Sequence, residues 1–340
     1  MLCVTSMGKH TCSVNFEDIT SLENLYDAWR EFLPGKRSKP DVEEFSIRLI
    51  DNSITLADEL FDMTYRHGGY KSFFIHDPKR RHIHKASVRD RLLHHAVYRK
   101  LYPYFDQRFI HDSYSCRIGK GVYKALDRFQ VFSRRVSKNN TKPCWILKCD
   151  IRKFFDSIDH EILINILNEH IPDTRVQWLL HNIIDSYHGK RGTGKGLPLG
   201  NLTSQLLGNV YMDIFDHWVK HELKQKYYIR YADDFVFFSQ DSELLLGFIP
   251  QIRAFLYDTL RLELHPKKII LKPVSSGLDY LGWVHFPHHS ILRKKTKERM
   301  FRKLRENPKT EVFQSYLGLL GHGNTHKVEQ ELHNMYWLLS

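Results

Sequence analysis

Apolar residues recur at helical spacing over the first part of the chain. Between residues 16 and 66 they lie three or four positions apart, and the polar stretch LPGKRSKPD interrupts them. The residues that set this spacing are Ile19, Leu22, Leu25, Tyr26, Trp29, Phe45, Ile47, Leu49 and Ile50. We therefore expect helices here. The next segment, HDPKRRHIHKASVRDRLLHHAVYRK from His76 to Lys100, predicts a basic strand and loop followed by a helix.

The middle of the chain alternates between buried strands and amphipathic helices. CWILKCDIRKFFDSI predicts a strand that ends near Asp150, followed by a helix with one apolar stripe. That stripe comprises Ile158, Ile162, Leu163, Ile166 and Leu167. A second amphipathic helix follows the glycine-bearing GTGKGLPLGN, and Thr203 or Ser204 is placed to cap its start. Its apolar residues are Leu206, Val210, Ile214 and Trp218.

The stretch YYIRYADDFVFF, residues 227–238, places two adjacent carboxylates inside an aromatic run. Tyr227–Tyr231 and Phe235–Phe238 read as strands, so the intervening ADD predicts a hairpin with Asp233 and Asp234 at its tip. The simpler interpretation is that these aspartates only satisfy turn chemistry, because Asp bonds readily to its own backbone.

The composition predicts a polyanionic partner. The chain has 340 residues, 42% hydrophobic and 26% charged, and its formal net charge is +12. A basic folded chain of this kind favours nucleic acid or an anionic membrane surface as partner. No apolar run approaches the roughly 18 residues that span a bilayer, and no export signal is visible, so nucleic acid is the better choice.

Cysteine usage indicates a reducing compartment. Cys3, Cys12, Cys116, Cys144 and Cys149 are scattered and form no CxxC pair. This pattern predicts neither a disulfide framework nor a cysteine zinc site. We expect a cytoplasmic protein.

Asp150 changes the meaning of the paired aspartates, because it is a third carboxylate predicted at a strand end. Three carboxylates in one cleft repel each other unless cations neutralise them. Two magnesium ions about 3.5–4 Å apart would do so, and this is the arrangement of nucleotidyl transfer.

At this point the motifs resemble those of a known family. YADD resembles the catalytic box of reverse transcriptases, CDIRKFFDSI their first aspartate box, and GLPLGNLTSQLLGN the helix behind the nascent base pair. RHIHKASVRDRLLHHAV and FIHDSYSCRIGKGVYKAL are similar to the fingers motifs, LELHPKKIIL to the motif after the catalytic box, and LDYLGWVHFP to the primer grip. The resemblance covers roughly residues 70 to 335, in the family's order.

Within that family the chain looks most like the reverse transcriptases of diversity-generating retroelements, which are related to group II intron and retron-type enzymes. These pair LGNLTSQ with a late segment similar to SYLGLLGHGNTHK. Leu199 and Gln205 are the departures from the group II intron pattern that point to this subgroup.

The resemblance and the chemistry together imply roles for the carboxylates. Asp150 and Asp233 would hold two Mg²⁺ ions, with Mn²⁺ as a substitute, while Asp234 assists and the Ile151 carbonyl completes the shell. Lys268, or its neighbour Lys267, would protonate the leaving pyrophosphate.

Other positions would bind the nucleotide. Arg81, with Lys79 or Arg80, would clamp the triphosphate; the alternative is a solvated charged loop. Phe155 falls where the family places its steric gate against ribonucleotides, and the alternative is a core aromatic beside Phe154.

Leu199, Gly200 and Gln205 would line the nascent base pair. A leucine at 199 offers only apolar contact where relatives have a glutamine, so fidelity should suffer. The resemblance implies errors at template adenines that diversify a target gene by mutagenic retrohoming; alternatively, Leu199 merely packs under the helix. Primer-grip residues would be Tyr280, Leu281, Gly282 and Trp283.

Two further patterns predict neither a zinc site nor a P-loop. The histidine-rich stretches HIH, HFPHH and GHGNTH lack zinc spacing, and GTGKG lacks the pattern of a P-loop. The cationic ILRKKTKERMFRKLREN fits a thumb helix that follows a duplex backbone, or else a solvated helix face.

These observations predict an α+β fold, a right-hand polymerase. We expect an N-terminal helical segment and fingers over residues 1–145, a palm with an antiparallel sheet flanked by helices over 146–290, and a short helical thumb over 291–340. The chain would have no room for an RNase H, endonuclease or integrase domain.

The expected activity is RNA-directed DNA polymerisation on a template RNA, with primer, dNTPs and cDNA as further partners. The resemblance also implies a small basic multimeric accessory protein. A defence-associated or other retron-like reverse transcriptase is the nearer alternative. A non-catalytic RNA-binding scaffold is the distant one.

Overall fold

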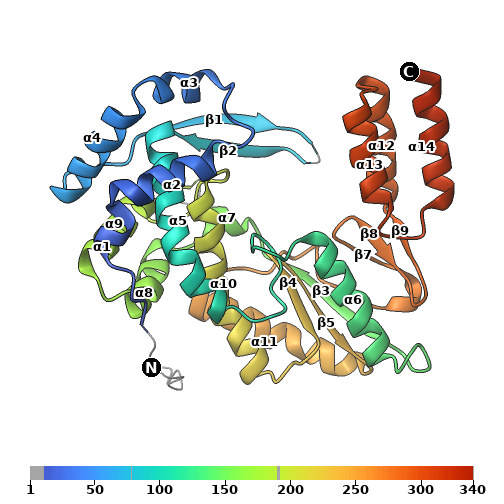
Figure 1. Cartoon of the computed structure of the whole chain (residues 1–340). Coiled ribbons are helices and arrows are strands. Elements are labelled where there is room, and N and C mark those ends of the chain that lie inside the picture. Colours follow the sequence, from blue (N-terminus) through green and yellow to red (C-terminus); the bar gives the residue numbers. More distant parts are fainter. Residues whose placement is uncertain (1–10, 78, 190–191, 340) are drawn as a thin grey trace. The chain divides into compact units, whose positions relative to one another are not determined.

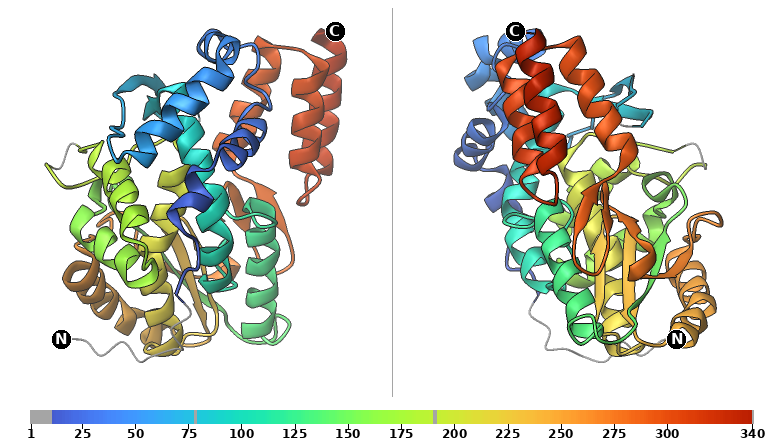
Figure 2. Two further views of the ribbon diagram at one scale, coloured as in Figure 1. Left: turned by 60° about the vertical axis from the view of Figure 1, so that its left-hand side comes forward. Right: turned by 90° about the vertical axis from the view of Figure 1, so that its right-hand side faces the viewer.

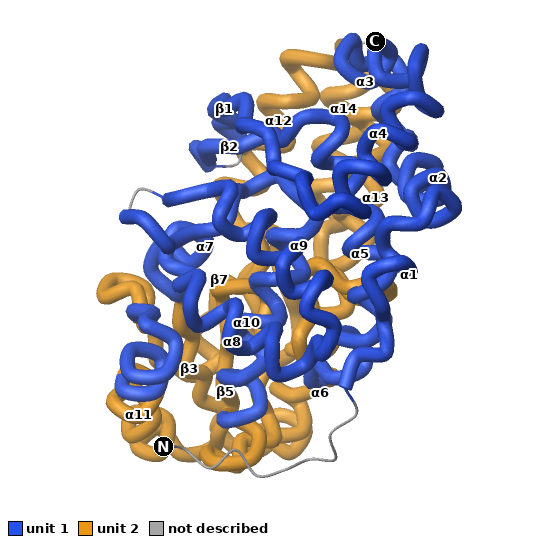
Figure 3. The backbone as a smooth tube through the Cα atoms, turned by 90° about the vertical axis from the view of Figure 1, so that its left-hand side faces the viewer, with its two compact units in different colours: residues 1–110, 151–218, 254–263 blue, residues 111–150, 219–253, 264–340 orange. Residues whose placement is uncertain are grey.

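The computed structural model describes residues 11–77, 79–189 and 192–339. Cys3, one of the cysteines used above, lies outside these ranges. The chain divides into two compact units, each built from several segments (Figure 3). The first unit contains residues 1–110, 151–218 and 254–263, and the second contains residues 111–150, 219–253 and 264–340. The division at residues 145 and 290 into fingers, palm and thumb stays a prediction.

The first unit opens with the expected helices. Ser21 caps α2, where its hydroxyl accepts a hydrogen bond from the Asn24 backbone N–H at 3.3 Å. The buried face of α2 packs on α5, and the Asn24 side chain donates to the Ala96 carbonyl there at 3.2 Å (Figure 1). The bounds are α1 Phe16–Thr20, α2 Leu22–Phe32, α3 Pro40–Ile47, α4 Leu49–Phe61 and α5 Val88–Arg108. Periodicity identified the helices but not every buried position, because Ile47 and Ile50 are 83% and 74% exposed.

A two-stranded hairpin precedes α5, where the basic segment predicted one strand and a loop. It pairs β1 (Tyr70–Ile75) with β2 (Arg81–Ala86) in antiparallel register. Ser87 then caps α5, because its hydroxyl accepts from the Asp90 N–H.

The remaining helices of the first unit carry the apolar stripes. They are α7 Phe154–Ser157, α8 His160–His170 and α9 Thr174–Asp185, together with most of α10 Leu202–His221 and the end of α11 Ser242–Leu260. The predicted cap of α10 is wrong. The helix already begins at Leu202, so Thr203 and Ser204 lie in its first turn, where both are buried.

The second unit is built on an antiparallel sheet in the order β4-β5-β3-β6. Its strands are β3 Trp145–Asp150, β4 Tyr228–Tyr231, β5 Asp234–Ser239 and β6 Ile270–Pro273. Helix α6 (Val122–Val136) packs against β4 and β5 (Figure 1). Phe129 and Phe132 of α6 enter a core with Ile146, Val236 and Phe238 of the strands, which supplies the apolar burial that holds this sheet.

The same core continues into the C-terminal elements. A short turn of 3-10 helix, Val274–Ser276, leads into a second sheet in the order β7-β8-β9, with strands Leu278–Tyr280, Trp283–His285 and Ser290–Leu292. Helices α12 (Lys294–Glu306), α13 (Thr310–Leu320) and α14 (His326–Leu339) follow and pack side by side, as both views in Figure 2 show. Trp283, Met300 and Leu320 join strands and helices in one apolar cluster.

Gly323, in the turn between α13 and α14, is the position at which this packing can be tested. A Cβ on Gly323 would overlap the ring of the buried Trp283 and approach the Ser290 carbonyl oxygen to 2.9 Å. We expect Gly323→Ala to lower the free energy of unfolding by about 1–3 kcal/mol, as overpacking does. Urea denaturation measures it.

Gly318→Ala is the matched control, because its Cβ in α13 meets nothing within 4 Å. It should leave stability unchanged or raise it by up to about 1 kcal/mol. Equal effects of the two substitutions would contradict the packing of Trp283 against this turn.

Candidate active site

The hairpin that bears the paired aspartates turns on two residues. Tyr231 of β4 pairs with Asp234 of β5, so Ala232 and Asp233 form the turn. Ala232 takes a positive φ of 55°, which suits the twist of a two-residue hairpin. The fully buried Arg230 supports this turn, because its Nη1 donates to the Ala232 carbonyl at 3.2 Å. The expectation that both carboxylates lie at the tip is therefore wrong, since Asp234 begins the strand.

The register of the sheet brings two carboxylates face to face. Asp150 at the end of β3 is the direct cross-strand partner of Asp234 in β5. Directly paired residues share one face of the sheet and lie within about 5.5 Å of each other. Like charges opposite each other are destabilising. The pair therefore needs nearby cations.

Two lysines supply these cations. Lys268 Nζ lies 2.8 Å from both oxygens of Asp150, and Lys148 Nζ lies 3.3 Å from Asp234 Oδ2. Of the two lysines left open above, Lys268 contacts Asp150, whereas the Lys267 backbone N–H donates to His265 Nδ1. Sequence reasoning missed Lys148. Its signal was a single cation in the otherwise apolar stretch WILKC, two residues before Asp150.

The pKa of the Asp234 carboxyl is raised above its ordinary value. Burial raises its pKa to about 6, and the charges of Asp150 and Asp233 act in the same direction, while Lys148 opposes them. Its Oδ1 atom is buried and accepts no hydrogen bond. A buried carboxylate oxygen without a partner is costly, and a bound cation would remove that cost.

The chemistry of these carboxylate oxygens is suited to magnesium. Carboxylate oxygens are the hard ligands that Mg²⁺ prefers, and the orphaned Asp234 Oδ1 is a free one. Among the residues that the structure describes, no three His, Cys, Asp or Glu side chains are already grouped to hold an ion. Ion binding at Asp150 would replace its contact with Lys268, whereas Asp234 can offer Oδ1 to an ion while Oδ2 keeps its contact with Lys148. Ile151, the predicted carbonyl ligand, follows Asp150 directly and its side chain is buried.

The predicted primer-grip residues form a second tight hairpin. Leu281 and Gly282 make the turn, with φ values of 50° and 91°. Tyr280 and Trp283 flank it as a cross-strand pair, and both are buried. Burial and the nearby Asp234 carboxyl raise the pKa of Tyr280 well above its ordinary value, and its hydroxyl has no hydrogen-bond partner.

In the first unit, the loop before α10 is tied to β2. The His84 N–H donates to the Leu199 carbonyl and the Asn201 side chain donates to the His84 carbonyl, each at 2.9 Å. Between them Gly200 has a φ of 110°, and a Cβ there would lie 2.7 Å from the Ile83 side chain. Only glycine suits this position. Leu199 is half-buried.

Gln205 lies in the first turn of α10, and it is exposed. Phe154 is core, as expected of one of the two adjacent phenylalanines, and only 3% of it is exposed. Phe155 is half-buried, with its ring beside Gly208 of α10. A Cβ at Gly208 would touch that ring at 3.4 Å.

The cations of the hairpin loop are exposed. Arg81 begins β2, and Lys79 precedes it by two residues. Arg80 stacks its guanidinium on Phe74 of β1, with the Cζ atom 4.1 Å from the ring centroid. Arg81 and Lys79 are therefore placed on the solvent side, where an anionic ligand could reach them.

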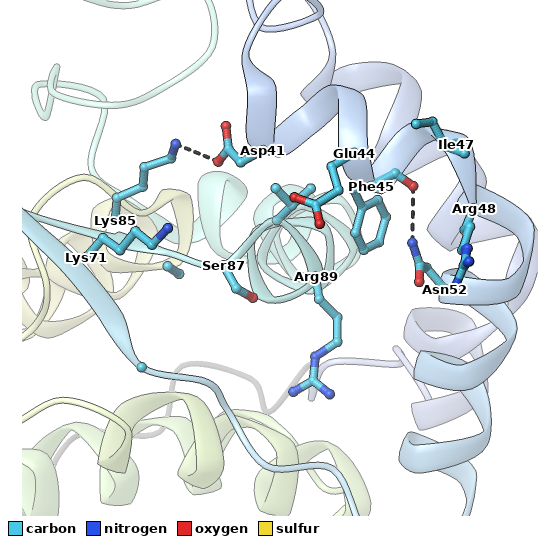
Figure 4. Close-up of a pocket in the computed structure, with 13 residues that line it drawn as sticks. Asp41, Glu44, Phe45, Ile47, Arg48, Asn52, Lys71, Lys85, Ser87 and Arg89 are labelled. Atoms are coloured by element: carbon cyan, nitrogen blue, oxygen red, sulfur yellow. Dashed lines mark hydrogen bonds and ion pairs between the residues drawn. The ribbon is translucent and has the colours of Figure 1, made fainter.

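A pocket of about 780 Å³ lies elsewhere in the first unit, between α3, α4 and the β1–β2 hairpin (Figure 4). Lys85 bonds Asp41 across it at 2.6 Å, and the Asn52 side chain donates to the Phe45 carbonyl. None of the predicted site residues lines it. Within the described ranges, no helix combines the length and apolarity that a bilayer crossing needs.

Comparison with known proteins agrees with the sequence motifs. The family described as "Reverse transcriptase (RNA-dependent DNA polymerase)" matches residues 75–285. Protein YkfC of Escherichia coli is 24% identical over 280 residues, which cover 71% of each chain. The group II intron-encoded protein LtrA of Lactococcus lactis is 22% identical over 300 residues, 67% of this chain and 48% of LtrA. The chain thus spans less than half of the length of LtrA.

Solved structures resemble the fold. Telomerase from Candida albicans, in complex with a fragment of telomeric RNA, superposes with a TM-score of 0.52 at 11% identity. The match covers 82% of this chain and 57% of the telomerase chain. Together with the antiparallel sheets, it confirms the predicted α+β polymerase fold.

The pKa of Asp234 makes stability depend on pH. Between about pH 4 and 6 the folded chain keeps a proton that the unfolded chain, with its ordinary value of 3.8, has lost. Raising the pH through this window should therefore lower the free energy of unfolding, by at most about 3 kcal/mol from this group. Asp234→Asn should remove that decrease.

Urea denaturation at pH 4.5 and pH 7 without divalent ions measures the difference. Asp258→Asn, at an exposed position of α11, is the control and should behave as wild type. An Asp234→Asn variant with the full wild-type pH dependence would show that this carboxyl is not the perturbed group.

Proposed function

The chain belongs to the reverse transcriptase family, and from this membership we propose that it is an active RNA-directed DNA polymerase. One observation supports activity above all others. The carboxylates of Asp150 and Asp234 face each other in register, Asp233 is next to them in the turn, and two lysines neutralise the cluster. A scaffold that only bound RNA would gain nothing from this costly arrangement.

The carboxylates would hold two magnesium ions, with Mn²⁺ as a substitute. Asp150 and Asp233 would bind both ions, Asp234 would assist, and the Ile151 carbonyl would complete the ligand set. When bound, the ions would activate the primer 3′-hydroxyl and stabilise the leaving pyrophosphate. Lys268 Nζ already lies 2.8 Å from Asp150 Oδ1. We infer that Lys268 would donate a proton to the leaving pyrophosphate when the ions are bound at Asp150.

The nucleotide would be bound by residues of the first unit. Arg81, assisted by Lys79 or Arg80, would clamp the triphosphate, and Phe155 would exclude the ribose 2′-hydroxyl. Leu199, Gly200 and Gln205 would line the nascent base pair. The geometry at Gly200 supports this assignment. Gly200 has a backbone conformation that suits only glycine, and the carbonyl of the adjacent Leu199 accepts a hydrogen bond from His84 of β2. In the second unit, the hairpin of Tyr280, Leu281, Gly282 and Trp283 would grip the primer.

We further propose a biological role in sequence diversification. Its support is the resemblance of LGNLTSQ and SYLGLLGHGNTHK to diversity-generating retroelements. The template RNA, the primer, the dNTPs and the cDNA would be its partners, together with a small basic multimeric accessory protein, in the cytoplasm. The alternative is a defence-associated or retron-like enzyme, which would use the same catalytic residues.

Asp233→Asn tests catalysis. The amide keeps the size of the side chain but removes the charge that would hold the ions, so primer extension should fall by at least about 100-fold. The assay is primer extension on an RNA template with Mg²⁺, with Asp258→Asn as control. Extension at a near wild-type rate would refute the assignment of Asp233.

Leu199→Gln tests the diversification role. A glutamine can restrain the base pair by a hydrogen bond, whose net worth corresponds to about a tenfold change at most. We expect errors opposite template adenines to fall by up to about tenfold, as counted by sequencing the cDNA. Leu199→Met, which keeps an apolar side chain of similar volume, should retain them. An unchanged error spectrum in the glutamine variant would assign Leu199 to packing alone.

A further inference from the structure

Lys148 makes a pair of contacts that the family motifs do not account for. Its Nζ atom lies 3.3 Å from Asp234 Oδ2 and donates to the backbone carbonyl of Asp279 at 2.9 Å. The same ammonium lies 5.7 Å from the centre of the Tyr280 ring. All these residues belong to the second unit. One cation therefore joins a candidate catalytic carboxylate to the first strand of the primer-grip hairpin.

Lys148 lies at a position where burying a cation raises the free energy of the folded state. It sits in the middle of β3, between Val236 of β5 and Ile270 of β6, and its side chain is 16% exposed. Its chain neighbours Leu147 and Cys149 are fully buried. Burying an ammonium here costs free energy unless anionic or carbonyl oxygens surround it. The Asp234 carboxylate and the Asp279 carbonyl meet that need.

The two ends of this contact lie in different sheets. Asp234 belongs to the sheet β4-β5-β3-β6, and Asp279 belongs to the sheet β7-β8-β9. The Asp279 carboxylate is held in turn by Arg293 at 3.3 Å, just before α12. A backbone carbonyl cannot rotate away as a side chain can. The contact with the Asp279 carbonyl therefore fixes the position of the ammonium relative to the hairpin.

We propose that Lys148 is a positioning residue that sets the primer 3′ end against the catalytic carboxylates, by holding Asp234 and the Asp279 backbone at one ammonium group. The inference rests on the proposed polymerase function. It assigns no proton transfer to Lys148. Small errors in the placement of reacting groups cost large factors in rate, so a residue of this kind affects turnover more than binding.

Lys148→Met tests the proposal, because it keeps most of the stem and removes the ammonium. We expect the single-turnover extension rate to fall by about 10–100-fold, while the dissociation constants for primer–template and dNTP stay within about threefold. Lys148→Arg should recover part of the rate, because it restores a cation that can reach both oxygens. Lys272→Met, a lysine of β6 in the same sheet, is the matched control and should behave as wild type.

A readout without catalysis accompanies the kinetics. With 2-aminopurine at the primer 3′ terminus and EDTA present, the fluorescence of the bound primer–template reports how the terminus is held. Lys148→Met should change this fluorescence by at least about twofold at saturating protein, and Lys272→Met should not. The melting temperature of each variant is measured alongside, to separate positioning from unfolding.

The outcomes separate this inference from the proposed function. Wild-type rate and fluorescence in Lys148→Met would overturn the inference alone. A loss that follows the melting temperature and is not improved by Lys148→Arg would assign Lys148 to folding, and would also overturn it. A wild-type chain that binds primer–template but never extends it would refute the proposed function, while the fluorescence would still decide the role of Lys148. A wild-type chain that does neither would refute both.

Discussion

The central constraint in this structure is the repulsion between carboxylates that the sheet register forces together. Asp150 and Asp234 are direct cross-strand partners, and Asp233 follows in the turn. Their proximity raises the cost of ionising Asp234, which burial has already made high. Lys148 offsets that cost at Asp234, and Lys268 forms an ion pair with Asp150. The same repulsion makes the cluster receptive to divalent ions, which would offset it more strongly.

The scaffold around the cluster explains why these groups can be held so close. The sheet is fixed from one side by the phenylalanines of α6, and the buried Arg230 secures the turn that carries Asp233. The second sheet and helices α12–α14 share the same apolar core. A site built on strands with a common core keeps its side chains in place better than one built on loops. The two tight hairpins, at Ala232–Asp233 and Leu281–Gly282, are thus parts of one packed body.

Much of this arrangement could be predicted from the sequence, and the failures have physical causes. Alternation placed the strand that ends at Asp150, and the family motifs then placed Asp233 near it. The tip position of Asp234 was wrong because a two-residue turn needs only Ala232 and Asp233. Lys148 escaped notice because no pattern along a strand shows which oxygens a cation will meet in another sheet. Ile47 and Ile50 fit a helical period, yet tertiary packing left them exposed.

The most direct test of the whole account is to locate the ions. Crystals of the chain with an RNA template, a DNA primer, a non-hydrolysable dNTP and Mn²⁺ would show manganese by its anomalous scattering. The account predicts two peaks, about 3.5–4 Å apart, each bound by Asp150 and Asp233. Peaks away from these carboxylates, or none with the dNTP in place, would contradict it.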